Sequence, residues 1–270
     1  RNSAVELSLH DKLSWFDEVV KYLGRLSLAT GCCRDGRRSK RRAEAAGRFE
    51  GDLILNDRQR QLIVQDIAEG LSRNGLKDST KRWPNNEIIF YIQKEHFNGD
   101  QVQAILRGIE DLSQASCVKF RPYRKGDRDA VVGSRRGCFS QVGYQGGYQV
   151  LNLSGRHPVG RGCFRHGTVV HELLHTLGFY HMQSSPDRDD YVDVIWENIV
   201  QRKHNFRKYN LFSVSDFGVG YDYDSVLHYS RKAFSSNGGD TLVPKKVPVN
   251  IVLCLGCSPS IVCPTLQKLA

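Results

Sequence analysis

The chain has 270 residues, 40% of them hydrophobic and 25% charged, which is the composition of an ordinary globular protein. No stretch approaches the roughly 18 consecutive apolar residues of a membrane span, so we expect no membrane-spanning segment. The sequence begins at Arg1 and not at Met, so we interpret it as a fragment in which a missing signal peptide says nothing about secretion.

The net charge is +10, and the positive charge is spread out except for one dense run at residues 37–42, RRSKRR. Such a run is found in nucleic-acid-binding proteins, but also in exposed linkers and in sites for basic-specific proteases. We favour a linker or processing site, because no aromatic or recognition-helix pattern accompanies the run. We therefore predict no nucleic-acid partner.

In chain order, residues 1–47 are poorly patterned, although residues 14–28 have apolar side chains at helical spacing. A short amphipathic helix is predicted over residues 59–71, and a polar break follows at residues 72–75. A new unit begins near Trp83.

The unit that begins near Trp83 mixes strands and helices. Runs rich in β-forming residues predict strands over residues 87–93, 117–121, 130–132 and 148–153. Apolar residues at helical spacing predict helices over residues 99–116 and 168–177, and a further helix is expected over residues 196–209. There is no βαβ rhythm and no internal repeat, so α+β is the expected fold class.

The chain has eight cysteines, and their pattern indicates whether the protein folds in an oxidising or a reducing compartment. Cys254 and Cys257 form one CxxC pair, but no second pair follows at zinc-ligand spacing. Cys117, Cys138 and Cys163 stand singly beside strand and loop patterns, as disulfide cysteines do. The pattern favours an oxidising compartment and a secreted, extracellular protein.

The stretch HELLHTLGFYH, which begins at His171, predicts a metal site. Two histidines four residues apart, His171 and His175, share one face of a helix and can bind one ion. Gly178 lets the chain leave the helix and bring His181 round as a third ligand. Imidazole ligands in tetrahedral geometry favour zinc, one ion per chain. Glu172 faces the open coordination position, where it can act as a general base.

Two alternatives compete with a catalytic site. The first is coincidence. With this composition, HExxH arises by chance in about one chain in ninety, and requiring Gly178 and His181 as well lowers that probability by a further factor of about three hundred. A purely structural zinc site is the stronger alternative. A carboxylate beside an open coordination position favours hydrolysis instead.

The stretch resembles the astacin form of the metzincin zinc motif, and two later segments support the resemblance. Residues 186–192 (PDRDDYV) are similar to that family's continuation, and residues 221–229 (YDYDSVLHY) to its Met-turn. The resemblance covers about residues 48–246. It implies a zinc endopeptidase with two lobes around a cleft, an upper mixed sheet with helices and a lower, less regular lobe. It also implies that Tyr229 is a further zinc ligand in the resting enzyme and stabilises the oxyanion during catalysis.

Upstream, the sequence FEGD at residues 49–52 is similar to the FxGD motif of astacin pro-segments. The resemblance implies that Asp52 binds zinc in place of water and holds the enzyme latent. The family register places the mature N-terminus at Asn74, so we predict cleavage between Arg73 and Asn74 by a trypsin-like protease. Cleavage at residues 81–82 is the alternative.

Four stretches are therefore expected along the chain. They are an N-terminal segment at 1–47, a pro-segment at 48–73, a protease domain at 74–246 and a divergent tail at 247–270.

The resemblance also implies a disulfide between Cys138 and Cys163 beside the cleft. Tyr148, Gln149 and Val150 lie on a strand similar to the family's edge strand, where an extended substrate would add antiparallel. Protein or peptide substrates and a monomeric enzyme are expected.

Several features depart from the family. They are Met182 in place of Glu, Ser185 in place of Arg, Leu227 in place of the Met of the Met-turn, and the tail 247–270. The partner of Cys117 is therefore open among Cys254, Cys257 and Cys263. These departures motivate an alternative, a catalytically impaired secreted zinc-binding homologue, but the intact histidines and glutamate favour the enzyme.

Overall fold

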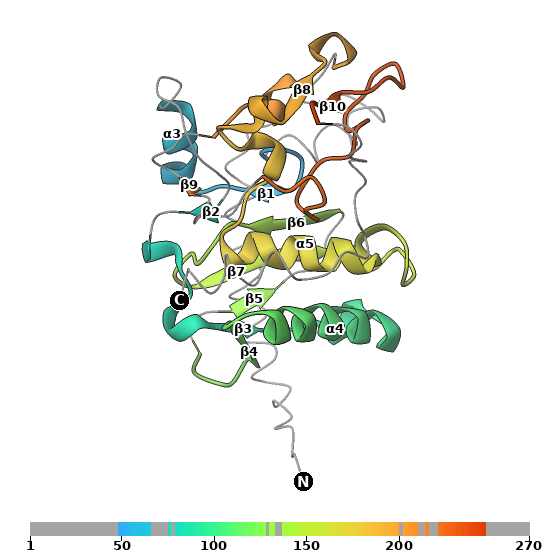
Figure 1. Ribbon diagram of the computed structural model, residues 1–270. Coiled ribbons are helices and arrows are strands. Elements are labelled where there is room, and N and C mark those ends of the chain that lie inside the picture. Colours follow the sequence, from blue (N-terminus) through green and yellow to red (C-terminus); the bar gives the residue numbers. More distant parts are fainter. Residues whose placement is uncertain are drawn as a thin grey trace, which may run out of the picture.

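The computed structural model describes residues 48–65, 75–76, 79–127, 130–132, 137–199, 202–209, 214–215 and 221–246 (Figure 1). The expected helix at 14–28, the basic run, the cleavage site Arg73–Asn74 and the tail 247–270 lie outside these residues.

A six-stranded mixed sheet is the largest element, in the order β1-β6-β7-β5-β3-β4. In that order the strands are Leu53–Ile54, Cys138–Gln141, Tyr148–Leu153, Ala130–Val132, Glu87–Phe90 and Lys119–Pro122. Every neighbouring pair is parallel except β6 and β7, which are antiparallel. The short first strand, β1, therefore forms one edge, and β4 forms the other.

Helices α4 (Gly99–Ala115) and α5 (His166–Leu177) pack against each other and against the sheet (Figure 1). A capping box begins α4: Asn98 accepts from the backbone N–H of Gln101 at 2.9 Å, and the Gln101 side chain accepts from the Asn98 N–H at 2.9 Å. Apolar stripes from both helices enter one core with the sheet, which includes Ile88, Leu112 and Leu173. This core fixes the position of α5, the helix with the HExxH motif.

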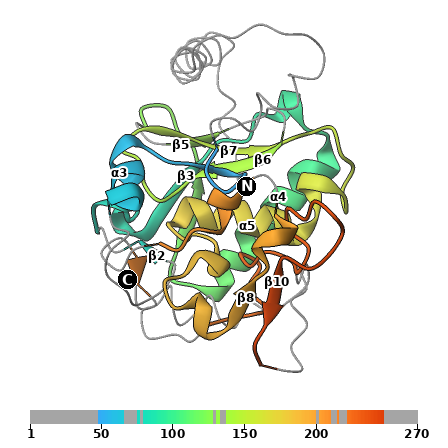
Figure 2. The same ribbon diagram turned by 90° about the horizontal axis from the view of Figure 1, so that it is seen from above.

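The chain beyond α5 forms a second, less regular part on the other side of that helix (Figure 1). It contains the antiparallel pair β8 (Val192–Val194) and β10 (Leu242–Pro244), together with short 3-10 turns. A separate apolar cluster holds it, with Ile199 and Phe206 fully buried. Helix α3 (Asp57–Gln65) and the antiparallel pair β2 (Gly75–Leu76) and β9 (Val214–Ser215) complete the described helices and strands (Figure 2).

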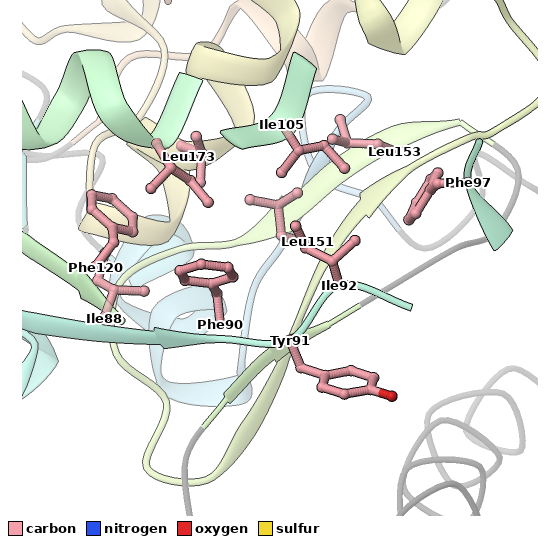
Figure 3. A pocket seen from close by; sticks show the side chains of 11 residues that line it. Ile88, Phe90, Tyr91, Ile92, Phe97, Ile105, Phe120, Leu151, Leu153 and Leu173 are labelled. Atoms are coloured by element: carbon pink, nitrogen blue, oxygen red, sulfur yellow. The ribbon is translucent and has the colours of Figure 1, made fainter. Parts of the chain in front are cut away.

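A small apolar cavity of about 40 Å³ lies between the sheet and the two helices (Figure 3). Side chains of both helices and of the sheet line it, and the Tyr91 ring points away from the others. A buried water needs two to four polar partners, which this lining does not offer. We interpret the cavity as a packing gap in the core.

The α+β class and the two-part architecture are confirmed. Three details of the sequence prediction were wrong. Residues 196–209 do not form one helix, because Trp196–Asn198 and Lys203–Phe206 are separate 3-10 turns and Arg202 has a left-handed φ of 70°. Strands β6, β8 and β10 were not foreseen, and β7 is not an edge strand. Among the described residues, no helix is both long and apolar enough to cross a membrane.

Candidate metal centre

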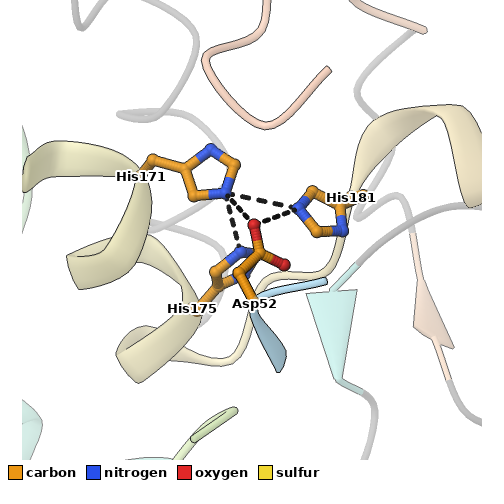
Figure 4. A group of neighbouring side chains, drawn as sticks. All are labelled: Asp52, His171, His175 and His181. Atoms are coloured by element: carbon orange, nitrogen blue, oxygen red, sulfur yellow. Dashed lines mark hydrogen bonds and ion pairs between the residues drawn. The ribbon is translucent and has the colours of Figure 1, made fainter. Parts of the chain in front are cut away.

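Helix α5 supplies the first half of the site. His171 and His175 are one helical turn apart, so both imidazoles leave the same face. The helix ends at Gly178, whose φ of 109° is a left-handed conformation that side chains disfavour, and whose N–H donates to the His175 carbonyl at 2.9 Å. The chain then turns back after the end of the helix, so that the His181 ring faces His171 and His175 (Figure 4).

The three imidazoles converge with Asp52 on one point (Figure 4). The Nε2 atom of His171 lies 3.0 Å from Nε2 of His175 and 3.3 Å from Nε2 of His181. Oδ2 of Asp52 lies 3.3 Å from Nε2 of both His171 and His181. One ligand atom from each of the four residues falls within 4.8 Å of every other.

The outer nitrogen of each imidazole has an acceptor. Nδ1 of His171 donates to the Val226 carbonyl at 2.7 Å, and Nδ1 of His175 donates to the Phe179 carbonyl at 2.7 Å. Nδ1 of His181 lies 2.5 Å from a carboxylate oxygen of Glu50. Because carbonyls and carboxylates only accept, the protons belong on Nδ1, and each Nε2 turns a lone pair inward.

A tight turn at residues 49–53 carries Asp52 into the site. Phe49 and Leu53 exchange backbone hydrogen bonds of 2.9 and 3.0 Å across the turn, and β1 then pairs with β6. The Asp52 carbonyl accepts from the Ser140 N–H at 2.9 Å. Gly51 has a φ of 103°, which favours glycine. The turn thus places the Asp52 side chain against His171 of α5 and against His181.

Glu50 is the functional residue that the sequence prediction missed. Its side chain is fully buried and accepts from Nδ1 of His181, from the Tyr209 hydroxyl at 2.5 Å and from the Ser184 hydroxyl. Nothing in the local sequence marks it, because its partners lie more than 130 residues away. The flanking FxGD resemblance, which pointed to Asp52, was the one signal near it.

Burial and charge shift the titration of the site. Burial raises the pKa of Glu172 well above its usual value, and the charge of Asp52 adds to the rise. Burial lowers the pKa of His175 well below its usual value. Burial would also lower the pKa of His181, but the carboxylates of Asp52 and Glu50 outweigh it and raise that pKa to about 10. The carboxylates of Asp52 and Glu50 therefore favour a positive charge beside His181, either a proton or a cation, whereas burial favours neutral His175.

Two buried carboxylate oxygens have no hydrogen-bond partner among the described residues, Oδ1 of Asp52 and Oε2 of Glu172. Buried oxygens of this kind call for a cation or a hydrogen-bond donor. Both belong to the residues expected to act at the metal.

The Tyr229 ring packs 4.9 Å from the His181 ring, measured between centroids, and its hydroxyl donates to the Glu50 backbone carbonyl. Burial raises the pKa of Tyr229 well above its usual value, so the hydroxyl keeps its proton. It sits beside the site as a hydrogen-bond donor, engaged by the 49–53 turn.

The expected substrate-binding residues need a correction. Tyr148, Gln149 and Val150 lie on β7, which pairs with β6 on one side and β5 on the other, so its backbone offers no free edge. The edge strand of the protein core on that side is β6, and β1 covers it. Cys138, the first residue of β6, forms a disulfide with Cys163 just before α5.

A family model described as astacin, a peptidase family, matches residues 75–259. The chain belongs to the astacin family. The matched region begins two residues after Arg73 and continues past residue 246, and the boundaries expected from the sequence stay predictions.

Relatives of known sequence and structure agree with that membership. The chain is 38% identical to the zinc metalloproteinase nas-4 of Caenorhabditis elegans over 201 residues, which cover 73% of the chain and 60% of the relative. It is 40% identical to seminal metalloprotease 1 of Drosophila melanogaster, over 64% of the chain and 71% of the relative. The structure of high choriolytic enzyme 1, a hatching enzyme zinc-protease of the medaka Oryzias latipes, matches with a TM-score of 0.61 and 29% identity over 74% of this chain and 98% of that one.

This astacin-family chain spans less than two thirds of several relatives, 60% of nas-4 and 47% of the zinc metalloproteinase nas-8 of Steinernema carpocapsae.

The residues present fit the zinc ion of the family. Zinc with bonds of about 2.0–2.1 Å to tetrahedral ligands has neighbouring ligand atoms about 3.3 Å apart, which is close to the 3.0–3.3 Å between the atoms here. Inward lone pairs on three imidazoles and one carboxylate oxygen cannot hydrogen-bond one another. A cation is the group that satisfies all four.

Proposed function

We propose that this protein is a zinc-dependent endopeptidase that acts on extended protein substrates and is made as a latent zymogen. The observation that carries the proposal is the convergence of three imidazole lone pairs beside buried Glu172, whose Oε2 has no hydrogen-bond partner among the described residues. Family membership supports the reaction class.

In this proposal His171, His175 and His181 hold the ion. Zinc, when bound, supplies a Lewis acid that polarises the scissile carbonyl and lowers the pKa of water towards ~7. The carboxylate of Glu172 takes a proton from the attacking water and passes it to the leaving amine nitrogen.

Two further groups orient the substrate. The backbone edge of β6 can accept an extended peptide as an added antiparallel strand, which suits cleavage within a chain. The Tyr229 hydroxyl can donate to the oxyanion that develops on the scissile carbonyl. For that, it must leave the Glu50 carbonyl that it now bonds.

Latency follows from the 49–53 turn in the same proposal. Asp52 occupies the fourth ligand position, and β1 occupies the β6 edge. Cleavage between Arg73 and Asn74 by a trypsin-like protease would separate the pro-segment at 48–73 from the protease domain. The disulfide and the eight cysteines support a secreted protein that folds in an oxidising compartment.

Casein hydrolysis after cleavage at Arg73 tests the enzyme proposal, with and without a zinc chelator. We expect chelator-sensitive activity that returns when zinc is restored. If folded, zinc-loaded, cleaved protein shows no such activity, the chain is an impaired zinc-binding homologue.

The uncut chain tests latency separately. Asp52→Ala removes the fourth ligand, so the uncut variant should hydrolyse casein above the uncut wild-type protein. Arg73→Ala should stay latent during trypsin treatment. If uncut Asp52→Ala matches the uncut wild type in activity, Asp52 does not hold the enzyme latent.

A further inference from the structure

We infer that His181, Ser184 and Tyr209 form a carboxylate-binding pocket behind the metal site, and that Glu50 is its ligand. This contact would hold the 49–53 turn in place without any metal, as a second anchor beside Asp52. The regulatory meaning of the anchor rests on the proposed zymogen function, but the pocket itself does not.

Three donors from separate residues converge on the one carboxylate. Nδ1 of His181 and the Tyr209 hydroxyl both lie 2.5 Å from Oε2 of Glu50, and the Ser184 hydroxyl donates to Oε1. The Tyr229 hydroxyl donates to the backbone carbonyl of the same residue. All polar atoms of Glu50 beyond its N–H are thereby paired with donors, as a buried charge requires.

The pocket is built by residues outside the turn. The Tyr209 N–H donates to the Ser184 carbonyl at 2.7 Å, so the two hydroxyl-bearing residues are tied to each other. The Tyr180 ring packs against the Tyr209 ring with centroids 4.6 Å apart. These contacts do not involve Glu50, although the Tyr209 ring also packs against the Phe49 ring of the turn, with centroids 6.1 Å apart. The pocket suits a carboxylate because its three donors meet the two carboxylate oxygens.

Glu50 also differs from Asp52 in burial and in backbone conformation. The Glu50 side chain is 0% exposed, whereas the Asp52 side chain is 22% exposed. Glu50 has a φ of 55°, a left-handed conformation that is uncommon for a residue with a side chain. Such a conformation persists where surrounding contacts determine it, and here those contacts are the hydrogen bonds that close the turn together with the pocket donors.

The two carboxylates contact opposite edges of one imidazole. Glu50 accepts at Nδ1 of His181, and Asp52 lies 3.3 Å from Nε2. Asp52 is therefore placed to act through the metal, whereas Glu50 acts on the far side of the ring. Removing the metal should weaken the first contact and leave the second.

Amide hydrogen exchange on the uncut full-length chain tests this inference. The reporters are the amides of Phe49, Leu53 and Ser140, whose hydrogen bonds close the turn and join it to β6. Glu50→Gln and Asp52→Asn are each measured with zinc and with a chelator.

A buried charge-assisted hydrogen bond is strong enough that Glu50→Gln should speed exchange at these amides by about ten- to a hundred-fold. The factor should be the same with and without zinc. Asp52→Asn should have a large effect with zinc and a smaller one after chelation.

Glu197→Gln, at an exposed glutamate, is the matched control and should change none of the three amides. If Glu50→Gln speeds exchange no more than this control does, the inference is wrong. A failed zinc-protease proposal looks different: casein hydrolysis is absent, while the exchange effect of Glu50→Gln in chelated protein stays.

Variants of the pocket keep the test decisive if Glu50→Gln does not fold. Tyr209→Phe removes one donor and leaves Glu50 in place, so the same amides should exchange faster. Where both single variants fold, the double variant Glu50→Gln/Tyr209→Phe should show less than the summed effect, because both changes break one contact. Unchanged exchange in Tyr209→Phe, or strict additivity in the double variant, would overturn the pocket.

Discussion

The metal centre has two halves that are held in different ways. Helix α5 carries His171, Glu172 and His175 and is embedded in the main core through Val169, Leu173 and other apolar side chains. The 49–53 turn faces it, closed by two backbone hydrogen bonds and a two-residue strand. Polar contacts from Glu50 and Asp52 attach it to the metal centre, and a small apolar cluster that includes Leu53 packs it against Tyr180 and Tyr209.

In the proposed zymogen, the contrast separates a permanent half, which stays after cleavage, from a removable half, which cleavage would release. A helix whose apolar stripe is part of the core unfolds only when the core unfolds. A short edge segment can unfold locally at a lower free energy. A site that is to be uncovered by cleavage needs this asymmetry, because the ligands must stay while the covering segment leaves.

Glu172→Gln should have the largest effect on the permanent half. Removing the general base should lower the casein hydrolysis rate of the cleaved protein by at least about 100-fold. Zinc content, measured by atomic absorption, should stay at one ion per chain, since the three histidines are intact. A variant that keeps its full rate would exclude Glu172 as the base.

Metal removal should destabilise the uncut protein, because the ligand atoms belong to both halves. An ion present at about a thousand times its Kd contributes about 4 kcal/mol, which corresponds to roughly 10 °C in Tm for a chain of this size. Differential scanning calorimetry with and without chelator measures the shift. Glu172→Gln is the control and should show the same shift, and an unchanged wild-type Tm would contradict tight metal binding.

A pair of leucines compares the two halves directly. Leu173→Ala opens a gap in the main core and should cost about 2–5 kcal/mol of global stability. Leu53, the last residue of the 49–53 turn, is fully buried. Leu53→Ala should therefore loosen the turn and raise the activity of the uncut chain. Thermal unfolding and casein hydrolysis are measured on both. An equal loss in Tm with no gain in activity for Leu53→Ala would mean that the turn unfolds with the core.

Asn98→Ala should have the smallest effect. It removes the capping box of α4, far in sequence from the metal ligands, and should cost about 1 kcal/mol, or roughly 2–4 °C in Tm. The casein hydrolysis rate of the cleaved variant should stay unchanged, and a large loss of rate would show that α4 does more than support α5.

The permanent half was readable from the sequence because its chemistry is local. His171 and His175 share a helical face by spacing alone, and Gly178 marks the end of the helix that brings His181 back. Helices at 99–115 and 166–177 also followed from apolar periodicity, which is strong over three or more turns.

The removable half was readable only in part. The resemblance of residues 49–52 pointed to Asp52, but the pairing of Glu50 with Tyr209 depends on tertiary contacts that no local pattern encodes. Runs of β-forming residues predicted β7 and β5 but not β6, and the family resemblance assigned to β7 the edge that belongs to β6. One helix was expected over residues 196–209, but Ile199, Phe206 and Tyr209 are buried without forming one helix.

The direction of β1 has one more consequence. It runs parallel to β6, whereas the proposed substrates would run antiparallel, so the covering segment presents its peptide groups with amino and carboxyl ends exchanged relative to a substrate. A peptide bond in that reversed orientation does not present its carbonyl carbon and leaving nitrogen in the order that Glu172 would serve. In the proposed zymogen the segment could therefore lie across the catalytic residues and still resist hydrolysis by them, so that its removal would need another protease.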